Sequence, residues 1–593
     1  MSAQAEPQQE RTRLRELADR YLPILGWLPK YQRRWLRPDA ISALAVWAVL
    51  VPQAIAYASL AGLPPEAGLA AAALPLLLYA ALGTTRQLTV GPGSTIAILV
   101  AATVGPLAAG DGSSYAALAA TLALLVGGIL MAAGVARLGR ISDFFAKPVL
   151  AGFVGGLAVV IAVGQAPKLF GIEGGGDNFF EELWNLGKDL PDTNPETLAV
   201  SAGSFLLLYA VSRLAPSAPA ALITVIVAIG IVTILDLGER GVAVVGEIPR
   251  GLPTPAIPRI GLGDISNLLP GAVGIAVIAL AESSATARSL AAKHKYEIDA
   301  DQELIALGAS NLGAGLFQGF AVDASLSRSA IADEAGMKTQ VSSLIAFALV
   351  LITAVALAPL FRNLADATLA ALIIISVVNL ISIDEFRRLY GLDKVEFGLA
   401  VISLLGVLLF GILPGLAVAI VAALSALVYR GYRPHTAVLG RVTGDEEDED
   451  YGFRDIERHP QAETYPGLVI FRFDTELFFA NANHFRDQIR EVVREAQPPA
   501  RAILVDAGAI SHIDTTGTDM LAELVSELTE SNVELLLARV KGPVRDILRR
   551  SGLEDAFGGD RIYPTVRAGV AAYLARHGGM EESTDQPTDD SVT

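Results

Sequence analysis

Two stretches of the sequence place polar and glycine residues in apolar surroundings, and their residue types suit the binding of an anion. The first stretch, 88–97, contains a Gly-Pro-Gly sequence followed by Ser94 and Thr95. The second stretch, 319–336, is too short and too polar to face lipid, because it carries a series of polar and charged side chains: Asp323, Ser325, Ser327, Arg328 and Ser329. A helix that begins at such a break inside a membrane presents free backbone N–H groups and the positive end of its dipole, which together attract an anion.

The two stretches occupy matching positions, because each lies in the third segment of a group of seven apolar segments. Broken segments at matching positions in two halves are typical of inverted-repeat transporters, whose binding site lies near the middle of the membrane. Arg328 adds a full positive charge at that depth. The alternative is that both stretches are structural re-entrant loops with a satisfied ion pair.

The first segment of each group also carries polar residues on one helix face. Gln53 and Tyr57 are four residues apart in the first segment, and Glu282 and Thr286 are four apart in the eighth. A carboxylate inside a membrane marks a functional site by default, so Glu282 is predicted to carry a coupling ion. That ion is a proton, or Na⁺ held together with Thr286 and backbone carbonyls. The alternative is that Glu282 only neutralises a nearby Arg side chain.

The elements that must position these residues are apolar runs near 20 residues long, the length that crosses about 30 Å of hydrocarbon. Fourteen runs are predicted as membrane segments, at roughly 40–60, 65–82, 92–109, 115–136, 147–167, 196–214, 217–236, 267–287, 302–317, 324–337, 340–360, 364–382, 395–412 and 414–430. An even number places both chain ends on one side. With a cytoplasmic N-terminus, the inside loops carry about twice as many Lys and Arg residues as the outside loops, as the positive-inside rule requires.

The composition supports this organisation and excludes several other functions. Of 593 residues, 52% are hydrophobic and 18% charged, below the roughly 25% charged of soluble domains. The absence of cysteine excludes disulfides, thiolate nucleophiles and zinc-thiolate sites. All six histidines lie outside the predicted membrane segments, and neither a phosphate-binding loop nor a metalloprotease motif is present. We therefore expect no enzyme activity, no resident metal, no cofactor beyond the coupling ion, and no nucleic-acid partner.

Five regions are predicted along the chain: a cytoplasmic N-terminal region (1–39), a transport domain (40–432), an acidic linker (433–460), a small α/β domain (461–578) and a disordered acidic tail (579–593). The α/β domain is predicted from strands at 468–473, 502–507 and 533–540 that alternate with helices at 483–496, 516–529, 543–551 and 566–576. The formal net charge of −17 is misleading, because six contiguous acids at 445–450 and five in the tail contribute much of it.

At these residues the chain resembles the SulP family of anion transporters, the sulfate permeases. Residues 52–65 (PQAIAYASLAGLPP) are similar to the family signature of the first span, and further similarities lie at 90–92, 282–288, 325–330 and 336–340. The C-terminal domain resembles a STAS domain through residues 479–482 (FANA) and 513–517 (IDTTG). The resemblance covers nearly everything from about residue 20 to 578.

The resemblance implies a polytopic α-helical membrane protein of fourteen spans in a seven-plus-seven inverted repeat. Spans 1 to 4 and 8 to 11 would form a core domain, and the others a gate domain, in a homodimer that works by elevator-like movement. The anion site would be formed by Gln53, Tyr57, the backbone around Gly93, Ser94 and Thr95, and the side chains of Ser325, Ser327 and Arg328. Glu282 would be the coupling carboxylate, with Thr286 and Asp323 beside it.

The chain departs from the family pattern at two places near this site. Ala321, Asp323 and Ala324 stand where the family usually has Pro and then Thr or Gly, and Gly93 replaces a bulkier residue. An acid at the site disfavours a doubly charged anion unless the acid is protonated or binds a cation. A glycine at position 93 widens the pocket.

Thr515 stands at the position where related STAS domains are phosphorylated, at the start of a helix. The alternative is that Asp514 or Thr515 only caps that helix. A cytoplasmic partner of the STAS domain is a further expectation.

The sequence thus predicts a secondary active transporter of a small anion in the plasma membrane, surrounded by lipid, with both termini in the cytoplasm and coupled to H⁺ or Na⁺. Sulfate is the first choice of substrate, bicarbonate the second, and a dicarboxylate or chloride the third. An uncoupled anion channel or exchanger is an alternative, and so is an anion sensor that signals through its STAS domain.

Overall fold

The computed structural model describes residues 21–108, 112–139, 147–176, 178–215, 218–251, 254–258, 260–442, 452–557 and 560–577. The predicted acidic tail, most of the N-terminal region and the acidic run at 445–450 lie outside these ranges. The chain divides into two compact units, one up to Ala423 and one from Leu424. Each unit is described by itself.

The first unit is helical. Its helices are α2 (Pro23–Trp27), α3 (Leu36–Leu60), α4 (Pro65–Leu82), α5 (Ser94–Val104), α6 (Gly112–Val135), α7 (Lys147–Phe170), α8 (Phe179–Asp189), α9 (Pro195–Leu214), α10 (Ala220–Ile234), α11 (Leu262–His294), α12 (Ala300–Leu316), α13 (Leu326–Glu334), α14 (Val341–Ile352), α15 (Asp366–Val378), α16 (Ile383–Leu392) and α17 (Lys394–Phe410), and α18 (Ile412–Tyr432) continues into the second unit. Each of the fourteen apolar runs overlaps one of these helices. Whether each run crosses the membrane stays a prediction.

Large apolar side chains on the outside of the first unit show that its surroundings are apolar. Leu206, Tyr209 and Leu214 of α9, Ile234 of α10 and Phe410 of α17 are all exposed. Within the described ranges, nine helices are long and apolar enough to cross a bilayer. Because a soluble protein rarely exposes so much apolar surface, these faces are suited to lipid. The chain is a polytopic helical membrane protein.

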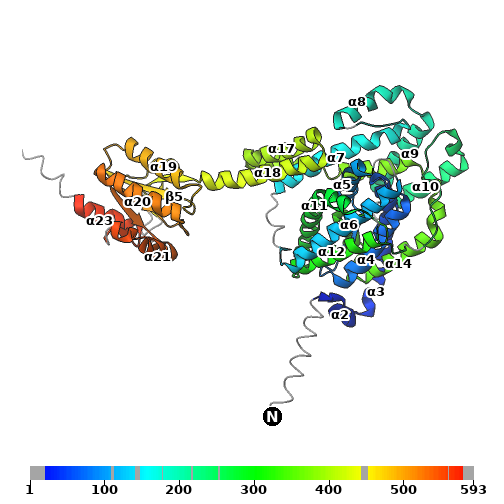
Figure 1. Ribbon diagram of the computed structural model, residues 1–593, viewed down its shortest axis with the longest axis horizontal. Helices are drawn as coiled ribbons and strands as arrows, with labels where there is room; N and C mark the ends of the chain where they lie inside the picture. Colours follow the sequence, from blue (N-terminus) through cyan, green and yellow to red (C-terminus); the bar gives the residue numbers. More distant parts are fainter. Residues whose placement is uncertain are drawn as a thin grey trace, which may run out of the picture. The chain divides into compact units, whose positions relative to one another are not determined.

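Small residues allow the inner helices to approach closely. Figure 1 shows α4, α6 and α12 packed together, and α12 contacts both α4 and α6. Where α6 meets α12, a Cβ atom on Gly127 would lie 2.7 Å from the carbonyl oxygen of Gly308. A Cβ on Gly308 would lie 2.8 Å from the carbonyl oxygen of Gly127. The two glycines therefore set the distance between these helices.

A two-stranded antiparallel pairing joins the two polar stretches. Strand β1 (Val90–Gly91) pairs with β2 (Asp323–Ala324), with Val90 opposite Ala324 and Gly91 opposite Asp323. Helix α5 begins three residues after β1, and α13 begins two residues after β2. The pairing therefore brings the N-termini of two short helices together inside the first unit. The expectation that the two breaks face each other is confirmed.

The second unit is an α/β domain built on one sheet of six strands, in the order β4-β3-β5-β6-β7-β8. The strands are β3 (Thr436–Arg441), β4 (Phe453–Asp455), β5 (Leu468–Phe473), β6 (Ala502–Asp506), β7 (Glu534–Ala538) and β8 (Ile562–Tyr563), and the helices are α19 (Ala482–Glu495), α20 (Thr515–Glu530), α21 (Gly542–Arg550), α22 (Leu553–Phe557) and α23 (Val566–His577). Strands β5 to β8 are parallel, and β3 is antiparallel to β4 and β5. Two apolar cores cover the sheet, one under α19 to α22 and one under α23.

The region 433–460 differs from the predicted polar linker, because β3 and β4 belong to the sheet. Ala437 and Leu439 of β3 and Phe453 of β4 are buried in the core that α23 covers. These two strands are short, and the acidic run between them dominates the composition of the region. The apolar residues of the strands were therefore not recognised as a pattern.

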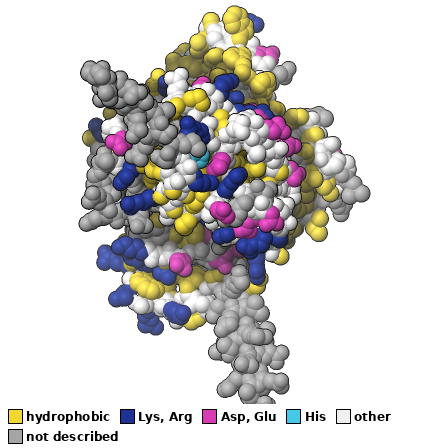
Figure 2. All heavy atoms as spheres, turned by 90° about the vertical axis from the view of Figure 1, so that its left-hand side faces the viewer, with side chains coloured by type: hydrophobic (Ala, Val, Ile, Leu, Met, Phe, Trp, Pro, Cys, Tyr) yellow, Lys and Arg dark blue, Asp and Glu magenta, His cyan; other side chains and the backbone are white. Residues whose placement is uncertain are grey.

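Charged side chains of both signs cover the α19 and α20 side of the second unit. Arg490 of α19 pairs with Glu527 of α20 at 2.6 Å, and Arg486 pairs with Glu523 at 3.3 Å. Basic and acidic side chains are also interspersed on the face shown in Figure 2. Exposed ion pairs of this kind contribute little to stability, so the apolar cores hold the domain together.

A pair of adjacent glycines on α6 tests the packing argument. We expect Gly127→Ala to destabilise the first unit by about 1–3 kcal/mol, because its methyl group would collide with α12. Gly128→Ala is the matched control, because a Cβ at that position meets no atom within 4 Å among the described residues. Thermal unfolding of the purified full-length chain in detergent measures both. Equal shifts in the two variants would contradict the argument.

Candidate functional site

Arg328 lies at the centre of the candidate site, in the first turn of α13. Its side chain is 1% exposed. Its Nη1 atom donates to the carbonyl oxygen of Pro92 at 2.6 Å and to Oε1 of Gln53 at 3.3 Å. The guanidinium group therefore connects α13, the loop before α5, and α3. Its Nε and Nη2 atoms have no hydrogen-bond partner among the described residues, so two donors remain for a ligand.

The two helix N-termini beside Arg328 are built by local sequence. Gly93 is the N-cap residue of α5, in an extended conformation, and Ser325 is the N-cap residue of α13. The hydroxyl oxygen of Ser325 accepts from the backbone N–H of Arg328 at 3.3 Å and lies 3.2 Å from the hydroxyl of Ser327. Both helix ends direct N–H groups and a positive dipole toward the same region, which favours a negative charge there.

Tyr57 extends the site to a fourth helix. Its side chain lies near those of Ser94 on α5 and Ser376 on α15. Sequence reasoning assigned Tyr57 and Ser94 to the site, and the structure brings them together. Ser376 was not expected from the sequence, because one serine in the apolar run of α15 gives no signal of its own.

Two carboxyl groups lie near the same loop. Asp323 of β2 is 3% exposed and lies next to Gly93, and its carboxyl group is a near neighbour of that of Glu282 on α11. Glu282 also contacts the hydroxyl group of Thr95. Oδ1 of Asp323 accepts no hydrogen bond from the described residues. A contact between two carboxyl groups requires a proton or a cation between them, so the arrangement suits a coupling ion.

The hydroxyl group of Thr286 bonds to the backbone of Glu282, whereas a shared ion site would place it beside the Glu282 side chain. Its hydroxyl group donates to the backbone carbonyl of Glu282, one turn earlier on α11, at 2.9 Å. Thr95, which was assigned to the anion, is the threonine that contacts the Glu282 side chain. The role of Thr286 at the coupling ion stays a prediction.

Polar residues that were not assigned to the site from the sequence hold the two paired strands in place. Asn311 of α12 accepts from the backbone N–H of Val322 at 2.9 Å and donates to the carbonyl oxygen of Val322 at 3.0 Å. Ser283 accepts from the backbone N–H of Ala324 at 3.0 Å, and Ser329 accepts from that of Thr89 at 2.9 Å. An Asn inside a predicted membrane helix was a signal that the sequence did offer.

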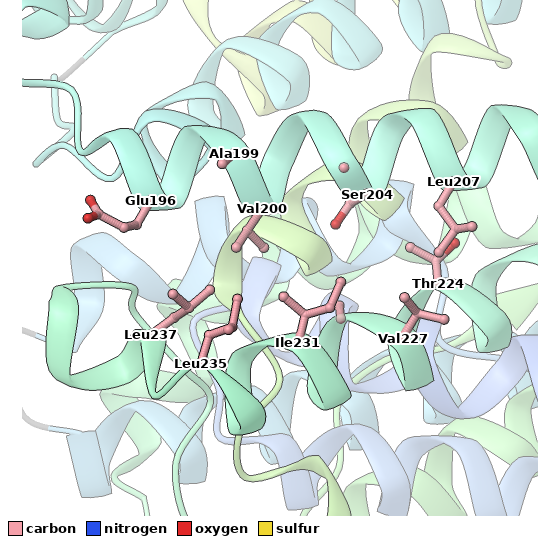
Figure 3. A pocket seen from close by; sticks show the side chains of 12 residues that line it. Glu196, Ala199, Val200, Ser204, Leu207, Thr224, Val227, Ile231, Leu235 and Leu237 are labelled. Carbon is pink, nitrogen blue, oxygen red and sulfur yellow. The ribbon is translucent and has the colours of Figure 1, made fainter.

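An apolar cavity of the first unit lies away from this site. It has a volume of about 240 Å³ and lies between α9 and α10 (Figure 3). The figure shows Val200 and Ser204 of α9 pointing toward Val227 and Ile231 of α10. Its lining is almost entirely apolar and includes none of the predicted site residues. The cavity is therefore separate from the residues assigned to the anion.

Thr515 lies in the first turn of α20 in the second unit and is exposed. Asp514 is the N-cap residue of this helix, and its carboxylate accepts from the backbone N–H groups of Gly517 and Phe479, both at 2.8 Å. The capping role of Asp514 is therefore confirmed. Phosphorylation of Thr515 stays a prediction.

The helical bundle and the paired breaks around a buried arginine define a polytopic membrane protein of a class that transports anions. Residues 36–403 match the sulfate permease family, and residues 459–569 match the STAS domain. The chain belongs to the sulfate permease family and has a C-terminal STAS domain. The members of this family are transporters and not enzymes.

Two relatives show how far the similarity extends. The chain is 40% identical over 557 residues to a protein of Mycobacterium tuberculosis (strain ATCC 25618 / H37Rv) named probable sulfate transporter Rv1739c, which covers 93% of this chain and 99% of the relative. It is 32% identical over 587 residues to the chloroplastic sulfate transporter 4.1 of Arabidopsis thaliana, covering 95% and 84%.

Two solved structures share the fold. The structure of SLC26A9 has a TM-score of 0.85 at 25% identity and covers 97% of this chain and 96% of that one. The transmembrane domain of a cyanobacterial bicarbonate transporter, BicA, has a TM-score of 0.59 at 21% identity and covers 66% and 98%. The second likeness concerns the fold alone.

The Asp514 cap gives a prediction for the second unit. We expect Asp514→Ala to destabilise the first turn of α20 by about 1 kcal/mol, because two backbone N–H groups lose their acceptor. Thr515→Ala serves as the control, because the side chain of Thr515 is exposed. Hydrogen–deuterium exchange of the full-length chain should show faster exchange at residues 515–518 in the first variant alone. Faster exchange in both variants would assign the cap to Thr515 as well.

Proposed function

We propose that this protein is a secondary active transporter of a small inorganic oxyanion. One observation carries the proposal: the β1–β2 pairing places two helix N-termini around Arg328, whose Nε and Nη2 atoms are unpaired among the described residues. Buried donors and helix dipoles of this kind suit an anion. The names of the two relatives support sulfate as the first choice, and the name of the BicA structure supports bicarbonate as the second.

The coupling ion is proposed to be H⁺ or Na⁺, carried between Glu282 and Asp323. A cation at this position balances the charge of the anion at Arg328, so that neither crosses the membrane as an isolated charge. No cluster of three or more His, Cys, Asp or Glu side chains suited to a metal ion occurs in the described ranges. This favours a monovalent ion over a bound divalent metal.

Alternating access is proposed to follow an elevator-like movement in a homodimer of the plasma membrane, with both termini in the cytoplasm. Residues from α3, α5, α11 and α13 form the site, and all four helices belong to the predicted core domain. Anion and coupling ion would then move together with that domain. The STAS domain would face a cytoplasmic partner.

Substitution of Arg328 tests the anion site. We expect Arg328→Ala to lower kcat/KM for sulfate and bicarbonate uptake at least about a hundredfold, since a buried charged hydrogen-bond donor is lost. Arg387→Ala is the control, because Arg387 lies on α16 with a side chain that is 77% exposed. Uptake by purified protein in proteoliposomes measures both. If Arg328→Ala transported at the wild-type rate, the anion would bind elsewhere.

Substitution of Glu282 tests the coupling. We expect Glu282→Gln to abolish accumulation driven by a pH or Na⁺ gradient while anion exchange at equal concentrations continues, because the amide cannot carry the ion. Gradient-driven uptake and exchange at equal concentrations, measured in the same proteoliposomes, separate the loss of coupling from the loss of anion binding. Unchanged gradient-driven accumulation would remove Glu282 from the coupling mechanism.

A further inference from the structure

The loop between β1 and α5 has unpaired polar atoms of opposite kinds on its two sides. Nη2 of Arg328 lies 3.5 Å from the position of a Cβ atom on Gly91. Asp323 is next to Gly93, where a Cβ atom would collide with its Oδ1 and lie 3.3 Å from its Oδ2. Arg328 thus offers free donors beside Gly91, while Asp323 offers a free acceptor beside Gly93. The unpaired donors and the unpaired acceptor thus lie beside the same short loop, two residues apart along it.

Gly93 is what allows Asp323 to occupy this position. Any side chain at position 93 would take the space of the Asp323 carboxyl group. The carboxyl group therefore lies directly against the N-cap residue of α5, at the end of the helix where the anion is proposed to bind. The carboxyl group of Asp323 thus lies beside both this helix end and Glu282.

An ionised Asp323 beside a bound anion is favourable only when a hydrogen or a cation lies between them, and with the coupling ion placed between Asp323 and Glu282 that hydrogen comes from the anion. Two unprotonated oxygens in a buried site repel each other, and each lacks a hydrogen bond. A hydrogen oxyanion, which has one O–H group, donates to Asp323 and accepts from Arg328 at the same time. We propose that Asp323 is a specificity-determining ligand of the anion, which selects oxyanions that carry one hydrogen.

This inference rests on the proposed function, and it refines the substrate class. Bicarbonate is a member of the selected class, and fully ionised sulfate is not. The names of the relatives place sulfate first, whereas the geometry at Asp323 favours the singly charged, hydrogen-bearing anion. The selection arises from this chain's own pair of residues, Gly93 and Asp323.

Bicarbonate and nitrate form a matched pair of probes. Both are planar, small and singly charged, and they differ in the single O–H group that bicarbonate has. Binding is measured as the rise in the unfolding temperature of the purified full-length protein with each anion, at constant ionic strength and pH in gluconate salts. We expect wild-type protein to bind bicarbonate at least about tenfold more tightly than nitrate. A wild-type ratio below about twofold would overturn the proposal.

Asp323→Asn tests the residue. The amide keeps the shape and offers N–H donors to nitrate, so the ratio of the two dissociation constants should fall to less than about threefold. Asp39→Asn is the matched control: Asp39 is also a buried aspartate of the first unit, but it accepts from the backbone N–H groups of Lys338 and Thr339. This control should keep the wild-type ratio. If the Asp323→Asn variant kept the wild-type ratio of the two dissociation constants, Asp323 would not be a ligand of the anion.

Gly93→Ala gives a second test that leaves Asp323 in the chain. Its methyl group takes the space of Oδ1, so the ratio should fall as it does in Asp323→Asn, and the double variant should show no further loss. If the losses of selectivity in the two single variants added up in the double variant, residues 93 and 323 would act independently, and the steric link between them would be overturned. Failure of the inference and failure of the proposed function are distinguishable: a protein that accumulates anions but binds nitrate as well as bicarbonate retains the function and loses the inference.

Discussion

The pairing of β1 with β2 is the interaction on which the rest of the structure depends. A chain that leaves the helical conformation within a membrane exposes backbone N–H and C=O groups that lipid cannot satisfy. Here the two breaks satisfy each other through the ladder and through a hydrogen bond from the backbone N–H of Ser325 to the carbonyl of Thr89. Gln340 donates to the carbonyls of Thr85 and Leu88, each at 2.9 Å, and so supports the approach to β1. Neither break is stable in such surroundings without the other.

The same constraint explains why the site is polar and yet buried. Two helices that begin inside the first unit leave their first N–H groups without helical partners, and these groups need an acceptor. Arg328 uses one donor atom to hold Pro92 and Gln53 and keeps two atoms free. The carboxyl groups of Glu282 and Asp323 supply the opposite charge on the other side of the loop. Binding capacity therefore arises from groups that the fold itself leaves unsatisfied.

Much of this arrangement could be predicted from the sequence. The length of the apolar runs located fourteen of the helices α2 to α18 but not α2, α8 and α16, and the glycine and serine content of the two breaks located both helix starts. The prediction that the breaks face each other depended on their matching positions, and the β1–β2 register confirms it. Gln53 and Tyr57 were found because they are one helical turn apart.

The rest could not be predicted, because it depends on contacts between segments far apart in the chain. Ser376 lies near Tyr57 across helices, and an isolated serine in an apolar run shows no spacing pattern. Asn311 did give a signal, as an amide inside a predicted membrane helix, but the sequence does not show that its partner is the backbone of Val322. Thr286 was assigned to an ion by helical spacing, but a threonine in a helix also bonds to the carbonyl one turn earlier, as it does here. Strands β3 and β4 were hidden by the acidic run between them.

The close contact between Gly93 and Asp323 has a consequence for how such a site changes by mutation. The two positions lie in different halves of the chain, yet a side chain at one excludes the carboxyl group at the other. With a larger residue at position 93, the carboxyl group of Asp323 would have to leave its place against the N-cap residue of α5. The two positions therefore constrain each other by volume, and a change at 323 depends on which residue stands at 93.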